Sequence, residues 1–258
     1  MLDLKNIEKY YSDNEKLFKR NILREYLQYK ILEIIFASEY ANKLAFIGGT
    51  ALRIIYQNRR FSEDIDFDNF GLTDIEFKET AEKVKNGLEA EGFQVEINIA
   101  GKESYRCNVR FPSLLFDSGL SKHQGEKILI QIDSLAQGFN YQPERKILNK
   151  FDVFTEIFVP SSDLLLSQKI NAALTRKRAK GRDFYDIVFL LSFTKPNYDF
   201  LLQKLGIGDA ERLRAKLVHI SDKLNFAELA QDIEPFLFNQ GDSKKVELFL
   251  DFIKQAKL

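Results

Sequence analysis

The sequence predicts a mixed α/β fold, of the α+β kind: a mixed sheet flanked by helices, followed by a mostly helical C-terminal half. Up to about residue 159, short apolar or alternating runs end at Gly or Pro and are separated by amphipathic helical stretches. After Pro160 the apolar residues recur almost only at helical spacing. We therefore expect two domains: an α/β domain with N-terminal helices over residues 1–159, and a helical domain over residues 160–258.

The first elements are helices and then a strand that turns sharply into another helix. Apolar residues recur at helical spacing between residues 12 and 39, which predicts one or two amphipathic helices. The apolar run 44–47 is closed by Gly48-Gly49, and residues 50–56 resume a helical pattern, with Thr50 near its N-terminus. This order predicts a strand, a Gly-Gly turn and a helix.

The rest of the first half alternates strands with one helix. Residues 64–70 begin with a strict alternation that places Asp64, Asp66 and Asp68 on one face of a strand. Thr73 and Glu76 form a capping-box pattern at the start of a helix that Gly92 ends. Further strands or extended segments are expected at 93–99, 105–111, 127–134 and 151–159.

The second half begins at a helix cap. Residues 160–163, Pro-Ser-Ser-Asp, end the last extended segment and start a helix. Helical patterns cover 164–178 and 183–193. There is no internal repeat that would indicate a solenoid.

Composition excludes several classes of protein. Lys and Arg equal Asp and Glu at 38 each, so any contact with nucleic acid must come from a local basic patch. The single Cys107 and the isolated His123 and His219 give little material for a disulfide, a zinc site or a catalytic triad. No apolar run approaches the about 20 residues that span a bilayer, so we expect a soluble, cytoplasmic protein.

The acidic strand is the first candidate site. Asp64 and Asp66 project from one face about 7 Å apart at Cα, where a divalent cation would relieve their repulsion. Mg²⁺ is commonly held by one or two carboxylates and substrate phosphates. A solvated strand edge is the serious alternative. A calcium loop fails because its sixth and twelfth positions are Asn69 and Ile75, and an aspartyl-phosphate motif fails because no apolar strand precedes Asp64.

The upstream turn favours the metal interpretation. Backbone N–H groups at Gly48-Gly49-Thr50 and the positive end of the helix dipole suit triphosphate oxygens. Together with the later Asp64-x-Asp66, this turn resembles the signature of the nucleotidyltransferase superfamily. That superfamily usually has a third carboxylate on a neighbouring strand, and Asp133 fits, although a strand-end Asp that caps a turn is the simpler alternative.

Longer segments make the resemblance more particular. Residues 46–53 (Phe-Ile-Gly-Gly-Thr-Ala-Leu-Arg) and 60–67 (Arg-Phe-Ser-Glu-Asp-Ile-Asp-Phe) resemble the AbiEii-type nucleotidyltransferases, toxins of toxin–antitoxin and phage-defence systems. Lys169, followed by residues 182–187 (Arg-Asp-Phe-Tyr-Asp-Ile), is similar to that family's Lys…Arg-Asp-x-x-Asp segment. The resemblance implies that Lys169 and Asp186 are needed for activity. The alternative for the second segment is a helical ion pair between Arg182 and Asp186.

The leading hypothesis is an enzyme that moves a nucleoside monophosphate from a nucleoside triphosphate to an acceptor. Asp64 and Asp66 would hold Mg²⁺, or Mn²⁺, with help from Asp133. The resemblance implies that the acceptor is the 3′ end of tRNA and that an antitoxin protein controls the toxin. The expected nucleotide-binding residues are Gly48, Gly49, Thr50, Arg53, Ser62 and Lys169.

Two alternatives remain, together with one undecided segment. A small molecule or a protein could be the acceptor, or the chain could be a non-catalytic nucleotide-binding module. The basic segment between residues 176 and 182 either binds the phosphates of the acceptor or nucleotide, or is a solvated loop. Its candidate acceptor-binding residues are Arg176, Lys177, Arg178, Lys180 and Arg182.

Overall fold

The computed structural model describes residues 2–101 and 104–258, which divide into two compact units. The first unit consists of Met1–Tyr56, Phe61–Gly138 and Gln142–Val159. The second consists of Gln57–Arg60, Phe139–Tyr141 and Pro160–Leu258, so two short segments that precede Pro160 belong to the helical unit.

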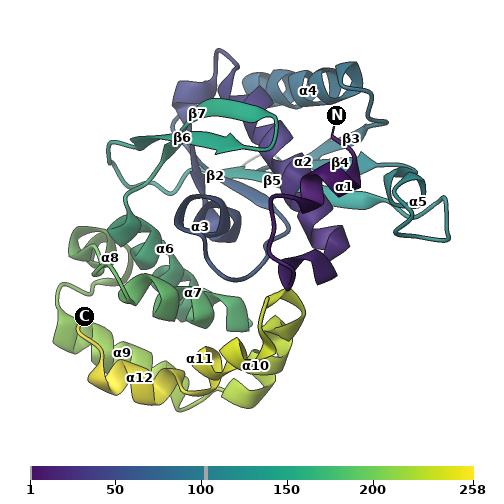
Figure 1. Ribbon diagram of the computed structural model, residues 1–258. Coiled ribbons are helices and arrows are strands. Elements are labelled where there is room, and N and C mark those ends of the chain that lie inside the picture. Colours follow the sequence, from purple (N-terminus) through teal and green to yellow (C-terminus); the bar gives the residue numbers. More distant parts are fainter. Residues whose placement is uncertain (1, 102–103) are drawn as a thin grey trace. The chain divides into compact units, whose positions relative to one another are not determined.

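The first unit is built on a five-stranded mixed sheet in the order β1-β2-β5-β4-β3 (Figure 1). Its strands are β1 (Leu44–Ile47), β2 (Ile65–Asn69), β3 (Glu96–Ala100), β4 (Tyr105–Phe111) and β5 (Ile128–Leu135), and a separate pair is formed by β6 (Glu144–Lys150) and β7 (Val153–Val159). Only β2 and β5 run parallel; the other neighbours are antiparallel. Its helices are α1 (Leu4–Glu8), α2 (Lys19–Phe36), α3 (Gly48–Tyr56), α4 (Asp74–Ala90) and α5 (Leu114–Asp117), with 3₁₀ turns at Glu15–Leu17 and Ala41–Lys43.

One face of the five-stranded sheet is apolar and covered by α2 and α4, which pack against each other. Ile65 of β2 lies opposite Ile132 of β5, and both are buried. On the same face, Phe36 of α2 contacts Phe67 with ring centroids 5.9 Å apart, and Phe77 of α4 stacks on Tyr105. Because side chains alternate between faces along a strand, the residues between these apolar ones emerge on the other, more open face.

The sequence predicted most of these elements. The mixed α/β class and the strand–turn–helix over residues 44–56 are confirmed. In β2 the alternation of burial holds from Ile65 to Phe67, whereas Asp68 is buried. Thr73 caps α4, and its capping box with Glu76 is present. Strand β6 was not predicted, because its sequence Glu-Arg-Lys-Ile-Leu-Asn-Lys carries too many charges to suggest a strand.

The second unit is helical. Its helices are α6 (Ser162–Thr175), α7 (Gly181–Leu191), α8 (Tyr198–Leu205), α9 (Ala210–Ser221), α10 (Phe226–Ile233), α11 (Lys244–Glu247) and α12 (Phe249–Gln255), with 3₁₀ turns at Glu234–Phe236 and Gln240–Ser243. Gly181 at the start of α7 packs so tightly on α10 that an added Cβ would lie 1.9 Å from the Leu229 carbonyl oxygen. Among the described residues no helix is both long and apolar enough to cross a bilayer.

Candidate active site

The open face of the sheet gathers the predicted carboxylates. Asp66 of β2 and Asp133 of β5 are partners in the parallel register, so their side chains emerge side by side from strands about 4.8 Å apart. Asp64 stands two residues before Asp66, at the entry to β2. We call Asp64, Asp66 and Asp133 the acidic face. All three side chains are only partly buried, which leaves them accessible to a ligand.

The Gly-Gly-Thr turn lies directly against this face. Gly48 opens α3 with φ +80°, a left-handed conformation that disfavours any residue with a Cβ. A Cβ at Gly48 would also lie 2.2 Å from Oδ2 of Asp66. Glycine is therefore required for two reasons, and the backbone of the turn touches the carboxylate that was predicted to bind metal.

Thr50 has a buried side chain that connects the two motifs. Its hydroxyl donates a hydrogen bond to the carbonyl oxygen of Asp64, so the first turn of α3 fixes the start of the acidic strand. Gln28 of α2 donates from Nε2 to the carbonyl oxygens of Ser62 and Glu63, both at 3.0 Å. Helices on two sides thus hold the segment that leads into Asp64. Ser62 itself is half-buried.

Arg53, expected near the nucleotide, takes part in a buried ionic network. Its Nε lies 2.8 Å from Glu25 and its Nη2 lies 3.0 Å from Glu15. Lys150 reaches the other oxygen of Glu25 at 2.8 Å. Burial opposes the ionisation of Glu25, but Arg53 and Lys150 together hold its pKa below the usual range. In this structure Arg53 therefore anchors α3, the helix that carries the glycine turn, to α2.

The residues of the acidic face fit a Mg²⁺ site that substrate phosphates complete. Adjacent carboxylates on one face supply the oxygen ligands that Mg²⁺ prefers, and it commonly takes only one or two from the protein. Among residues 2–101 and 104–258, no group of three or more His, Cys, Asp or Glu side chains is already arranged as a metal site. In this structure both carboxylate oxygens of Asp133 have protein partners: Arg106 Nε lies 2.8 Å from Oδ1, and Gln131 Nε2 lies 2.6 Å from Oδ2.

The helical unit holds the second predicted group in a buried ionic cluster. Asp186 is completely buried and accepts hydrogen bonds from Arg60 Nε at 2.7 Å, Arg60 Nη2 at 2.6 Å and Asn58 Nδ2 at 2.8 Å. Lys169 Nζ lies 2.8 Å from Asp186 and 3.5 Å from Asp183. We call Asn58, Arg60, Lys169, Asp183 and Asp186 the buried cluster.

This cluster differs from the ion pair that the sequence allowed. Asp186 pairs with Arg60 and Lys169 rather than with Arg182, four residues earlier on α7. Burial raises the pKa of Asp186, but the neighbouring cations prevail and lower it to about 2. Arg60 was not predicted as a partner because 126 residues separate it from Asp186 in the chain.

Asp183 is the less satisfied carboxylate of the cluster. It is buried, with Arg176 Nε at 3.2 Å and Lys169 at 3.5 Å. Neither of its oxygens makes a hydrogen bond of acceptable geometry to a described residue. Lys169 is thus held between two buried carboxylates, with 12% of its side chain exposed.

The basic segment is an exposed loop between α6 and α7. Arg176, Lys177 and Arg178 are exposed, and Arg176 is the one drawn toward Asp183. The positive charge of Arg182 is the main cause that lowers the pKa of Lys180. The partial burial of Lys180 and the positive charge of Arg176 lower it further. Like charges therefore crowd this loop, which suits an anionic partner.

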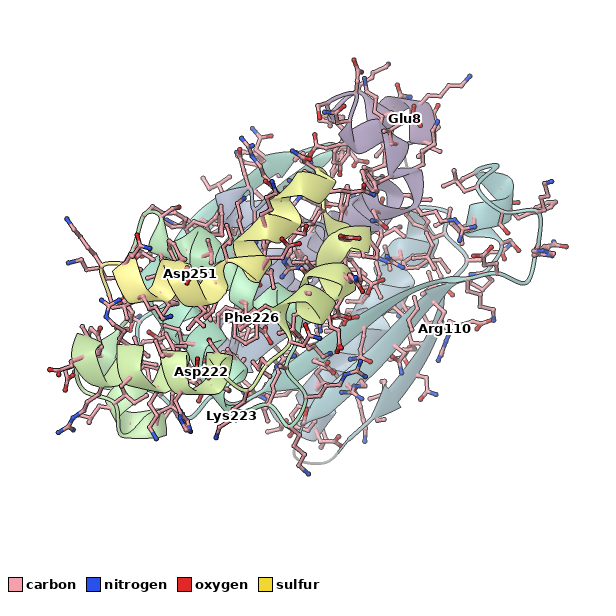
Figure 2. All side chains as sticks on the ribbon, turned by 90° about the horizontal axis from the view of Figure 1, so that it is seen from below. Glu8, Arg110, Asp222, Lys223, Phe226 and Asp251 are labelled. Atoms are coloured by element: carbon pink, nitrogen blue, oxygen red, sulfur yellow. The ribbon has the colours of Figure 1, made fainter. Side chains whose placement is uncertain are left out.

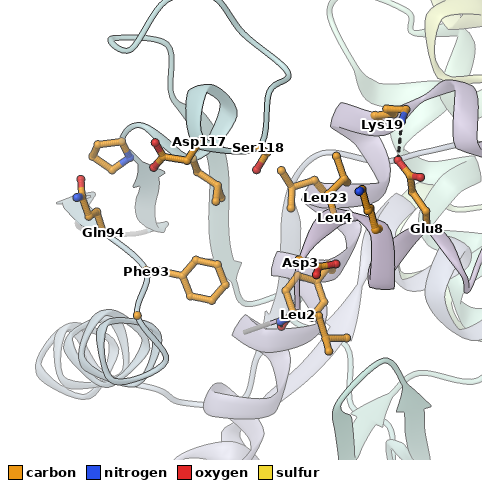
Figure 3. Close-up of a pocket in the computed structure, with 15 residues that line it drawn as sticks. Leu2, Asp3, Leu4, Glu8, Lys19, Leu23, Phe93, Gln94, Asp117 and Ser118 are labelled. Atoms are coloured by element: carbon orange, nitrogen blue, oxygen red, sulfur yellow. Dashed lines mark hydrogen bonds and ion pairs between the residues drawn. The ribbon is translucent and has the colours of Figure 1, made fainter.

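Two other features do not belong to the candidate site. A cavity of about 650 Å³ in the first unit is lined by the N-terminal segment, the turn at Gly92–Gln94 and residues around α5 (Figure 3). None of the predicted site residues lines it, and two of its charged residues, Glu8 and Lys19, pair with each other at 2.7 Å. Cys107 is buried, and burial raises its thiol pKa to about 12, which makes it a poor nucleophile.

Comparison with known proteins agrees with this chemistry. The chain is a nucleotidyltransferase. It belongs to the AbiEii family, whose model, described as nucleotidyl transferase AbiEii toxin of the type IV toxin–antitoxin system, matches residues 30–251. No curated protein matches the sequence.

Two solved structures from Helicobacter pylori have a similar fold. JHP933 matches with a TM-score of 0.56 and 17% identity, over 91% of each chain. An H. pylori protein named provisionally as a nucleotidyltransferase matches with a TM-score of 0.57 and 18% identity, over 91% of this chain and 94% of that one. At such low identity the likeness concerns the fold alone.

Proposed function

We propose that this chain uses Mg²⁺ to transfer a nucleoside monophosphate from a nucleoside triphosphate to the 3′ end of a tRNA. One observation carries the proposal: the Gly48 turn contacts the carboxylate of Asp66, which stands beside Asp133. Phosphate-binding backbone and metal-binding carboxylates thus meet at one place in the first unit. The expected biological role is a toxin that arrests growth, acts in phage defence and is controlled by an antitoxin protein.

In this proposal Asp64 and Asp66, with Asp133, hold Mg²⁺ or Mn²⁺. A bound cation would neutralise phosphate charge and polarise the reacting phosphoryl group. The backbone N–H groups of Gly48, Gly49 and Thr50 bind phosphate oxygens, and Ser62 adds a hydroxyl.

The transfer exchanges a phosphoanhydride bond of the nucleoside triphosphate for a phosphoester bond to the acceptor. The hydroxyl oxygen of the acceptor forms a bond to the α-phosphorus while the bond from that phosphorus to the bridging oxygen breaks. Pyrophosphate departs with the electron pair. We assign the hydroxyl proton to Asp133, because Asp186 is fully buried and its four contacts with cationic or amide nitrogens hold its pKa at about 2.

Lys169 is the cation we assign to stabilising phosphate charge. Its ammonium is held by Asp186 at 2.8 Å and Asp183 at 3.5 Å, so its position is fixed before any substrate binds. Asp186 is then a positioning residue, because it acts through Lys169. Asn58 and Arg60 in turn fix Asp186.

The division of charge between the units supports an RNA acceptor. The second unit contains 18 Lys and Arg against 13 Asp and Glu, a formal net charge of +5, whereas the first contains 20 against 25, or −5. The neutral total conceals this difference. Acceptor phosphates are expected on the basic loop, at Arg176, Lys177, Arg178, Lys180 and Arg182.

An incubation with each of four labelled nucleoside triphosphates and bulk tRNA, with Mg²⁺ or Mn²⁺, tests the proposal. Transfer of label by the native protein and its loss in Asp66→Ala support it. Absence of transfer with any nucleotide and either metal would overturn the tRNA assignment.

The net charge of −5 on the first unit favours an acceptor that is not a nucleic acid, namely a small molecule or a protein. The double variant Lys177→Ala/Arg178→Ala separates the two, since both side chains are exposed and neither belongs to the buried cluster. With an RNA acceptor, its KM for RNA rises and depends less steeply on salt, while the KM for the nucleotide stays constant. Unchanged KM for RNA would favour the other class.

A further inference from the structure

Arg106 is a residue of the acidic face that the sequence did not single out. It lies on β4 opposite Asp133 of β5 in the antiparallel register, so both side chains emerge on the open face of the sheet. Its Nε lies 2.8 Å from Asp133 Oδ1, and half of its side chain is exposed. Asp66, Asp133 and Arg106 thus form a row across three neighbouring strands.

Arg106 carries the charge opposite to that of the acidic face, and it forms its ion pair with Asp133. Its hydrogen bond to Asp133, then the charge of Asp133 and, more weakly, that of Asp64 raise the pKa of Arg106. Arg106 therefore serves as the counter-ion of Asp133 when neither metal nor nucleotide is bound.

The guanidinium has donors to spare. Its hydrogen bonds to described residues use Nε alone, toward Asp133. Both terminal NH₂ groups remain, and a planar guanidinium binds two oxygens of a phosphate at once. A cation that binds Asp133 would also weaken the attraction of that carboxylate for Arg106.

We propose that Arg106 is a nucleotide-binding residue, which moves from Asp133 to a phosphate of the nucleoside triphosphate when the metal–nucleotide complex binds. This inference rests on the proposed function. The exchange leaves Asp133 free to serve the metal or accept the acceptor's proton. Asp133 holds Arg106 in place beforehand, so the guanidinium is positioned before the nucleotide arrives.

The test compares Arg106→Gln with Arg110→Gln. Arg110 lies four residues further along β4 on the same face, between Leu129 of β5 and Glu96 of β3 (Figure 2). Glu96 pairs with Lys127 at 2.8 Å, so Arg110 is a control for an arginine of the same strand face that lies away from Asp133. Two binding measurements are made on each folded variant. Titration with a fluorescent, non-hydrolysable nucleotide in Mg²⁺ gives the nucleotide Kd, and the paramagnetic signal of free Mn²⁺ gives metal binding without nucleotide.

We expect Arg106→Gln to raise the nucleotide Kd about tenfold or more and to tighten Mn²⁺ binding in the absence of nucleotide. Arg106→Lys should recover part of the nucleotide affinity, and Arg110→Gln should behave as the native protein does. A rise in KM for RNA with an unchanged nucleotide Kd would assign Arg106 to an acceptor phosphate and overturn the proposal.

Other results also overturn it. Weaker Mn²⁺ binding with an unchanged nucleotide Kd would mean that Arg106 only orients Asp133. Equal effects of Arg106→Gln and Arg110→Gln would indicate a general charge effect. If the native protein itself bound no nucleotide in Mg²⁺, the proposed function would fail with this inference, whereas native binding that Arg106→Gln leaves unchanged would refute the inference alone.

Discussion

The buried cluster and the acidic face differ in how the charge of their carboxylates is balanced. In the buried cluster, Asp186 has no exposed surface, and Arg60, Asn58 and Lys169 satisfy it. On the acidic face, the carboxylates are partly exposed, and Arg106 pairs with one of them, Asp133. An Asp that stands out in the sequence can therefore either stabilise the fold or bind a ligand. The number of cations that contact its carboxylate distinguishes the two roles.

The difference predicts opposite outcomes for substitutions. On the acidic face, removing a charge should abolish activity and leave stability unchanged or higher, because like charges repel there. In the buried cluster, removing a charge should cost stability, because its partner cation is left buried.

The largest expected effect is on activity in Asp66→Asn. We expect transfer of labelled nucleotide to fall about 10³-fold, since the amide removes a metal ligand and metal stabilisation is worth several kcal/mol. The melting temperature should stay the same or rise slightly. A variant that keeps more than a tenth of native transfer would show that Asp66 is not a ligand of the catalytic metal.

Asp186→Ala should be the most destabilising of these changes. Removing the carboxylate leaves Arg60, 2% exposed, without its counter-ion, which costs about 3–5 kcal/mol of unfolding free energy. Denaturant unfolding measures the loss. The double variant Arg60→Met/Asp186→Leu removes both charges and should recover most of it; a double variant as unstable as the single one would contradict this account of the cluster.

Gly48→Ala tests the contact between the turn and the acidic face. Its matched control is Gly71→Ala, since Gly71 also has a positive φ, +89°, but no atom lies within 4 Å of its added Cβ. Both variants bear the backbone strain. Only Gly48→Ala displaces the Asp66 carboxylate, so we expect its transfer rate to fall about 100-fold further than that of the control. Equal rates in the two folded variants would separate the turn from catalysis.

The smallest expected effect is a pH dependence of stability. The folded pKa of Asp186 is about 2, below its ordinary 3.8, so its contribution of about 2 kcal/mol is present above pH 4 and is lost as the pH falls toward 2. The difference in unfolding free energy between the native protein and Asp186→Asn should shrink by about 1 kcal/mol from pH 6 to pH 3. A difference that stays constant would mean that Asp186 is not ionised by its partners.

The sequence predicted what depends on neighbours in the chain. Alternation identified β2, and the order of Gly48-Gly49 and Thr50 identified the turn, because a strand period and a helix start are local properties. It also predicted a third carboxylate, Asp133, on a strand that neighbours that of Asp66, and β5 is that strand. Partners distant in the chain could not be predicted, because they depend on strand register and helix packing. These include Arg60 for Asp186, Arg106 for Asp133 and Glu25 for Arg53.

The central claim is that the acidic face holds the catalytic metal together with the nucleotide. A crystal grown with Mn²⁺ and a non-hydrolysable nucleoside triphosphate tests it most directly, because the anomalous signal locates the metal. The account predicts a Mn²⁺ peak coordinated by the carboxylates of Asp64 and Asp66 and by phosphate oxygens of the nucleotide, next to the Gly48 turn. A bound nucleotide whose metal lies away from both carboxylates would contradict it.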